Sequence, residues 1–340
     1  MLFKYIMVVE LSEMGKYANQ RTLVMKVLNI LGILVIYPFF IYSQQSNFNS
    51  YSQELPNVKN GIDMVAISGG IFKMGNPSNL PKTIVKLDSF WIGKYEIPWG
   101  IYELFVFESI DITDDGKKDR TVDAVTRPTP PYLDMTFGMG KDSFPAVGMT
   151  QYNAIQFCKW LYLRTGIFFR LPTEAEWEYA CKAGSETAYF FGNSDVNADE
   201  YAWFINNSDG KTHPIGTKKP NAWGIYDMTG NVTEWTDDQY IIDFYSQFSG
   251  KIANNPVAVP KQLYPISIRG GSFKDSSEKL ESGYRSGSDP SWKIMDPQIP
   301  KSNWWFPEAP FIGFRIVRPI KSPTKEDIKT YYNRAPIADY

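Results

Sequence analysis

Cysteine and histidine, the side chains that most often carry covalent catalysis or bind transition metals, are scarce in this sequence. Its 340 residues contain two cysteines, Cys158 and Cys181, and one histidine, His213. Both cysteines fall on apolar faces of expected helices, where a free thiol behaves as a small hydrophobic side chain. We therefore expect two buried thiols, with a disulfide as the alternative that export would permit. His213 lies in a Thr-His-Pro-Ile-Gly loop, where a structural hydrogen bond is the expected role.

Hard oxygen ligands occur together in the segment Gly230–Trp235. Asn231 and Glu234 offer side-chain oxygens, and carbonyls of the turn could complete the shell of a calcium ion. The alternative is a tight glycine turn in which Glu234 bonds to the backbone. A second acidic stretch, 111–119, imitates a calcium loop, but Val122 stands where the bidentate glutamate belongs. We interpret that stretch as a solvated acidic loop.

Two adjacent indoles, Trp304 and Trp305, lie in a proline-rich loop near the C-terminus. Neighbouring side chains in such a loop cannot easily both point inward, so one of them is a candidate platform for a peptide or a glycan. The alternative is that both belong to the core, as we expect for Trp292 and Phe306. No Ser-His-Asp arrangement or phosphate loop stands out, and a formal net charge of −2 gives no indication of a nucleic-acid partner.

The elements that must position these residues include a few short helices. Thr173 and Glu176 have the spacing of a capping box, which predicts a helix within Arg170–Gly184 that ends in a left-handed turn at Gly184. Three more helices are expected: one that opens at Pro98, one over 151–165 between Thr150 and Gly166, and a loose one over 324–332.

The remaining sequence predicts short strands and long loops. Apolar runs separated by turn residues predict strands over 64–67, 71–75, 83–87 and 90–93. The 25 glycines, the 23 prolines and an aromatic content of 16% favour many turns around a core built from rings. Few helices and many short strands together predict an α+β fold.

The N-terminal region predicts an exported protein. Lys26 precedes an apolar run that ends in Ser43 and a polar stretch, which is typical of a cleaved signal peptide with Met25 as its natural start. The alternative is a retained membrane anchor. The expected organisation is a signal peptide over 1–43, a polar linker over 44–60, one domain over 61–320 with an irregular insertion at 108–145, and a polar tail over 321–340.

The sequence resembles the formylglycine-generating, or sulfatase-modifying factor, family from about Met64 to Pro319. The resemblance rests on long motifs in the family's order: Gly69–Gly75, Phe144–Val147, Cys158–Leu161, Arg170–Gly184, Lys219–Trp235, Arg269–Phe273 and Gly313–Val317. It implies a C-type-lectin-like α+β fold with few short helices, short strands and long loops.

The resemblance also implies where catalysis would occur. Copper-dependent members of the family bind Cu(I) through two cysteines near the C-terminus, since a soft ion prefers thiolates. Here Ser286 and roughly Glu281 occupy those positions, so copper chemistry is not expected. Cys158 and Cys181 match structural cysteines of the family whose C-terminal partners are missing here. A related branch uses iron held by three histidines, which a chain with one histidine excludes.

Other family properties carry over to matching residues. The resemblance implies a calcium ion at Asn231 and Glu234, and a substrate groove bordered by a C-terminal cluster. The ligand-binding candidates in that cluster are Tyr284, Arg285, Trp304 and Trp305.

The interpretation that follows is a non-catalytic binding or scaffold module, secreted or located in the periplasm or cell envelope. Its partner would be an extracytoplasmic protein, peptide or glycan, with no nucleic acid and with membrane contact only through an uncleaved signal segment. The alternative is a formylglycine-generating oxidase that acts on exported sulfatases.

Overall fold

The computed structural model describes residues 48–55, 58–59, 61–75, 83–107, 134–297 and 301–334. The expected signal peptide, the acidic stretch 111–119 and most of the insertion at 108–145 lie outside these residues. Backbone contacts divide the chain into residues 1–49 and 50–340, and the fold described below is that of the second unit. Within the described ranges, none of the helices has the length and apolar character needed to cross a membrane.

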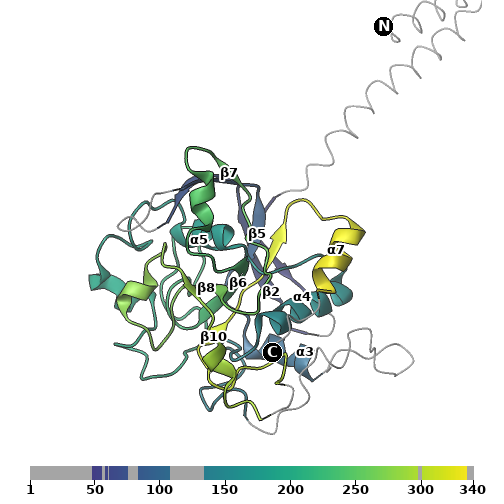
Figure 1. Cartoon of the computed structure of the whole chain (residues 1–340). Helices are drawn as coiled ribbons and strands as arrows, with labels where there is room; N and C mark the ends of the chain where they lie inside the picture. Colours follow the sequence, from purple (N-terminus) through teal and green to yellow (C-terminus); the bar gives the residue numbers. More distant parts are fainter. Residues whose placement is uncertain are drawn as a thin grey trace, which may run out of the picture. The chain divides into compact units, whose positions relative to one another are not determined.

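Three small sheets form the framework (Figure 1). The first has the order β1 (Tyr51–Gln53), β2 (Ile62–Ile67), β5 (Phe90–Gly93) and β11 (Val317–Pro319). The second has the order β10 (Ile312–Gly313), β6 (Thr233–Gln239), β8 (Ile266–Arg269) and β9 (Ser286–Gly287). The third has the order β3 (Gly70–Met74), β4 (Thr83–Leu87) and β7 (Ala253–Asn254). The α+β fold with many short strands is as the sequence predicted.

The helices are short and lie among long loops. They are α3 (Trp99–Val106), α4 (Gln151–Thr165), α5 (Glu174–Lys182), α6 (Ala198–Tyr201) and α7 (Lys325–Tyr332), with 3-10 turns η2 (Asp195–Asn197), η3 (Phe244–Phe248), η4 (Ser277–Leu280) and η5 (Pro290–Lys293). Rings from α3, α4 and the strand region near β11 meet in the core, where Phe157 contacts both Tyr102 and Phe314.

Local capping rules place α5 as expected. The Thr173 hydroxyl accepts from the Glu176 N–H, and the Glu176 carboxylate accepts from the Thr173 N–H, so the predicted capping box is present. The helix ends one residue earlier than predicted, because Ala183 takes the left-handed conformation (φ 45°) ahead of Gly184. Thr150 likewise caps α4, as predicted.

Two terminal segments are better ordered than expected. The expected linker over 44–60 contains β1, which pairs antiparallel with β2; a three-residue strand has too little hydrophobic pattern to stand out in sequence. The expected loose helix is α7, which packs beside α4 (Figure 1). The Tyr332 hydroxyl, itself buried, donates to the carbonyl of Phe169 over 2.7 Å. The aromatic rings of α7 therefore anchor this C-terminal segment, although its overall composition is polar.

Candidate functional site

Glu234, a predicted calcium ligand, is fully buried in an ion pair with Arg315. Guanidinium nitrogens of Arg315 lie 2.6–2.9 Å from both carboxylate oxygens, and the indole N–H of Trp177 donates to Oε2 over 2.8 Å. Both charged side chains are at most 1% exposed. The remaining guanidinium donors reach three backbone carbonyls, so the pair is well satisfied.

Asn231, the other predicted calcium ligand, is also buried, and both ends of its side-chain amide are hydrogen-bonded to protein groups. Its amide oxygen accepts the backbone N–H of His213 over 2.9 Å, and its amide nitrogen donates to Glu96 over 2.7 Å. A calcium ion needs several oxygens free to converge on it. With Asn231 and Glu234 both taken by protein partners, the residues present do not fit a calcium ion in this arrangement.

Two further carboxyl groups, Glu96 and Asp227, lie close to this pair. Burial, reinforced by the charges of Asp227 and Glu234, raises the pKa of Glu96 well above its ordinary value. Burial also raises the pKa of Asp227 to about 6. One arginine cannot neutralise three buried carboxylates, which is why the pKa of Glu96 is raised. Among the described residues, no group of three or more His, Cys, Asp or Glu side chains is arranged to hold a metal ion.

Arg285, a predicted ligand-binding residue, is instead a structural anchor. It makes a two-pronged contact to Glu174, with Nε and Nη2 2.7 and 2.9 Å from the two carboxylate oxygens. Its other donors reach carbonyls of the loop at 241–242, and its side chain is 9% exposed. The sequence prediction placed Arg285 among the ligand-binding residues, because its partner at the start of α5 lies 111 residues away and is not apparent from the local sequence.

Trp304 and Trp305 are both half-buried and stack on each other, with ring centroids 5.9 Å apart and planes at 22°. Their loop is fixed to the start of α4, where the backbone N–H of Thr150 donates to the Trp304 carbonyl. Phe306 is buried in the core, as predicted. The structure thus places the two indoles neither fully inside nor on an open face.

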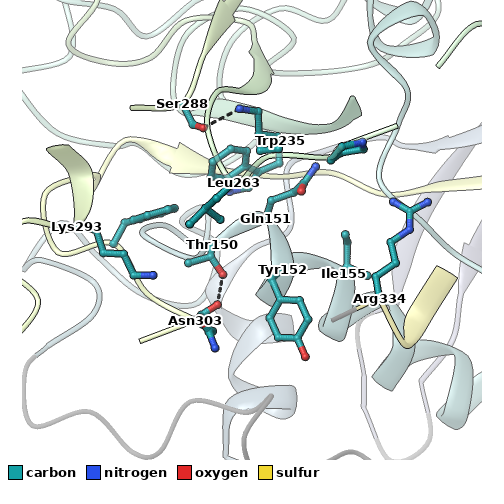
Figure 2. Close-up of a pocket in the computed structure, with 13 residues that line it drawn as sticks. Thr150, Gln151, Tyr152, Ile155, Trp235, Leu263, Ser288, Lys293, Asn303 and Arg334 are labelled. Atoms are coloured by element: carbon teal, nitrogen blue, oxygen red, sulfur yellow. Dashed lines mark hydrogen bonds between the residues drawn. The ribbon is translucent and has the colours of Figure 1, made fainter. Parts of the chain in front are cut away.

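A pocket of about 310 Å³ opens beside this loop, between the N-terminus of α4, the strands β6 and β8, and the segments 288–293 and 303–306 (Figure 2). The residues that line it are Thr150, Gln151, Tyr152, Ile155, Trp235, Pro260, Leu263, Ile266, Ser288, Lys293, Asn303, Phe306 and Arg334. None of the predicted site residues lines it, although Asn303 and Phe306 flank the two indoles. The lining residues come from five separate parts of the chain, and the only indication of the pocket in the sequence was that Asn303 and Phe306 adjoin Trp304 and Trp305.

His213 has the structural role expected of it. One ring nitrogen lies 2.8 Å from the carbonyl of Ser208, and the ring stacks on Trp203 with centroids 3.7 Å apart. Gly230 makes this arrangement possible, because a Cβ at that position would lie 2.3 Å from the Trp203 carbonyl oxygen.

Comparison with known proteins assigns the family. Residues 51–320 match the profile of the sulfatase-modifying factor enzyme 1-like domain. The chain belongs to the sulfatase-modifying factor family. It is 25% identical over 257 residues to the formylglycine-generating enzyme of Bos taurus, an alignment that covers 62% of this chain and 65% of the bovine protein.

Other relatives in the family carry different names. The chain is 30% identical over 207 residues to the chaperone protein LppX of Paenibacillus barcinonensis, covering 51% of this chain and 70% of LppX. It is 28% identical over 243 residues to the serine/threonine-protein kinase pkn1 of Chlamydia pneumoniae, covering 67% of this chain but only 36% of that protein.

Solved structures share the sulfatase-modifying factor fold. PvdO from Pseudomonas aeruginosa superposes with a TM-score of 0.60 at 23% identity, over 80% of this chain and 98% of PvdO. Treponema denticola variable protein 1 gives a TM-score of 0.59 at 21% identity, over 79% and 99% of the two chains. These matches confirm the predicted fold class.

The positions that the family resemblance assigns to copper do not offer copper ligands in this chain. Ser286 lies in the edge strand β9, paired with Ile268, and Glu281 lies after the turn η4; both are partly buried, as is Tyr284. A hydroxyl and a carboxylate are hard donors, whereas Cu(I) requires soft ones. The residues present therefore do not fit a cuprous ion.

Both cysteines are free, buried thiols, as expected. Burial raises the pKa of Cys158 and raises that of Cys181 to about 12, so neither forms a thiolate near neutral pH. The Ser282 hydroxyl, buried and otherwise without a hydrogen-bond partner, lies close enough to Cys181 to lower the pKa of the thiol slightly. The Ser282 side chain thus lies next to the Cys181 thiol.

Proposed function

We propose that this member of the sulfatase-modifying factor family is a non-catalytic binding or scaffold module that acts outside the cytoplasm, secreted or in the cell envelope. One observation carries the proposal: Glu281 and Ser286 stand where copper thiolates would be needed, and the two thiols that remain are buried and protonated. A thiol that does not ionise is a poor metal ligand and a poor nucleophile.

The binding part of the proposal is supported by the pocket next to the Trp304–Trp305 loop. Pockets with apolar walls and a few polar groups are the usual form of a ligand site. The partner proposed is an extracytoplasmic protein, peptide or glycan. Arg285 plays no part in it, because its donors are taken by Glu174 and by backbone carbonyls.

The test of the non-catalytic role is an oxidase assay. The purified protein is incubated under air with copper and a Cys-X-Pro-X-Arg peptide, and the peptide mass is followed. We expect no change for the natural sequence. A control variant with both Glu281→Cys and Ser286→Cys tests whether restored thiols bring back copper binding. Conversion of the peptide thiol to an aldehyde by the natural sequence would overturn the proposal and favour the formylglycine-generating oxidase, the activity named for the bovine relative.

The test of the binding role uses the two indoles. Trp304→Ala and Trp305→Ala are expected to fold normally and to lose a partner that the natural sequence captures on a glycan array or from a panel of envelope peptides. Phe107→Ala, which removes a 45% exposed ring at the end of α3, is the matched control. Full binding by both tryptophan variants would show that this loop is not the platform.

Export is tested by expressing the full chain and following the mass of the mature protein in cell fractions. The proposal expects loss of the segment before about residue 44 and recovery outside the cytoplasm. Quantitative retention of the uncleaved chain in the cytoplasm would contradict the proposed location.

A further inference from the structure

The pocket beside α4 has a deep apolar floor. Ile155, Trp235, Ile266 and Phe306 line it and are each at most 5% exposed. The rings of Trp235 and Phe306 lie 6.1 Å apart at 37° and make one continuous wall. A ligand group that enters would be surrounded by aliphatic and aromatic surface, so the apolar body of the ligand is where most of its binding energy would arise. At about 310 Å³ the pocket accommodates a small group rather than a long chain.

The charged side chains that line the pocket are all positive. Of the described residues that line the pocket, two are cations, Lys293 and Arg334, and none carries a carboxylate. Arg334 is paired over 3.0 Å with Asp237, which is not among the lining residues. Lys293 is 3% exposed, and Figure 2 shows its ammonium directed toward Thr150 and Asn303. An ammonium carries three donors, so it can serve a ligand in addition to a protein partner.

One neutral side chain of the pocket lining can also donate a hydrogen bond. The Ser288 hydroxyl oxygen accepts a hydrogen bond from the backbone N–H of Ile266 over 2.9 Å. Its own O–H points away from Ile266 and can donate to a different group. The pocket also opens at the N-terminus of α4, where the helix dipole adds partial positive charge. An ammonium beside a helix N-terminus, in an apolar cavity, is complementary to an anionic head on an apolar body.

We propose that this pocket binds a small carboxylate whose body is aromatic or branched aliphatic, with the carboxylate at Lys293 and the N-terminus of α4 and the body on Trp235 and Phe306. This inference rests on the proposed binding function and names the ligand class of that site. A free amino-acid derivative and the C-terminal residue of a peptide share this chemistry, and the experiment separates them.

The experiment measures binding by titration calorimetry and ligand-observed NMR on the full chain. The probes are N-acetyl-phenylalanine, its neutral C-terminal amide, and the peptide Gly-Ala-Phe with a free C-terminus. The variants are Lys293→Met, which removes the ammonium and keeps the stem, and Leu263→Trp, which fills the pocket from a half-buried rim position. Lys261→Met, which removes an exposed cation from the neighbouring loop, is the control, and thermal melts confirm that each variant folds.

We expect the natural sequence to bind the acid at least fivefold more tightly than the amide. Lys293→Met should reduce acid binding to the level of the amide, Lys261→Met should leave it unchanged, and Leu263→Trp should abolish binding of both. Tighter binding of Gly-Ala-Phe than of N-acetyl-phenylalanine would assign the site to peptide C-termini, and the reverse order to free acids.

Equal affinity for acid and amide, or binding that Leu263→Trp leaves intact, would overturn the inference. Absence of binding by any of the three probes would overturn it as well. None of these results bears on the oxidase assay or on the indole variants, so failure of this inference is distinguishable from failure of the proposed function.

Discussion

The buried pair of Glu234 and Arg315 gives the sharpest test of the structure. In the variant Arg315→Met, the Glu234 carboxylate stays buried without its cation, close to Glu96 and Asp227. Breaking a buried pair on one side typically costs about 3–5 kcal/mol, because an uncompensated charge remains in the interior. For a domain of this size each kcal/mol corresponds to about 2–4 °C in the melting temperature. We therefore expect a fall of about 10 °C, measured by thermal and urea unfolding.

A double variant separates charge from packing. Adding Glu234→Gln to Arg315→Met removes the stranded charge and keeps an acceptor for the Trp177 indole N–H, so part of the lost stability should return. The matched control is Lys141→Met, which breaks the exposed contact of Lys141 with Glu103 at 3.4 Å and should cost less than about 1 kcal/mol. The reasoning is refuted if Arg315→Met costs no more than Lys141→Met.

The same measurements test the calcium expectation at Asn231 and Glu234. Because both side chains are satisfied by protein partners, removing calcium with EDTA should leave the melting temperature of the natural sequence unchanged. A clear fall with EDTA that added calcium reverses would show that Glu234 serves a cation other than Arg315, and the ion-pair account would then be wrong.

Three further changes test separate features. Ser282→Cys should form a disulfide with Cys181 under air and stabilise the fold by about 2–4 kcal/mol, seen as a single remaining free thiol and reductant-sensitive unfolding; three titratable thiols would contradict the placement of Ser282. The raised pKa of Asp227, about 6, means that its ionisation costs stability as the pH rises from 4 to 7. Asp227→Asn should therefore lose less stability than the natural sequence between pH 5 and pH 7, by about 1 kcal/mol in urea unfolding, and equal pH dependence would count against this. Thr173→Ala should cost about 1 kcal/mol by removing the cap of α5, and a change within error would count against the cap.

Local features of the fold were predictable from the sequence. Thr173 and Glu176 lie three residues apart, so both residues of the capping box that starts α5 can be recognised in a short stretch of sequence. The same holds for Thr150 at the start of α4. By contrast, β1 is three residues long and leaves no recognisable pattern. Its place is set by pairing with β2, which a single segment does not reveal.

The candidate site was harder to predict, because its interactions join distant segments. Glu234 has the composition of a metal ligand, but its partner Arg315 lies 81 residues further along the chain. Arg285 and Glu174 are separated by 111 residues. A charged residue in sequence indicates an ionic partner without saying whether that partner is a ligand, a metal or another side chain. Lys293 and Ser288 were not predicted as site residues because neither belongs to a recognisable motif.

The sheet that contains β1 and β11 also determines how this domain can be used in larger proteins. The first and last strands lie on opposite edges of one four-stranded sheet, with only β2 and β5 between them. Neighbouring strands are about 4.8 Å apart, so the two ends of the domain lie roughly 15 Å from each other. Such closely spaced ends allow a domain to be inserted into a longer polypeptide without stretching the host chain.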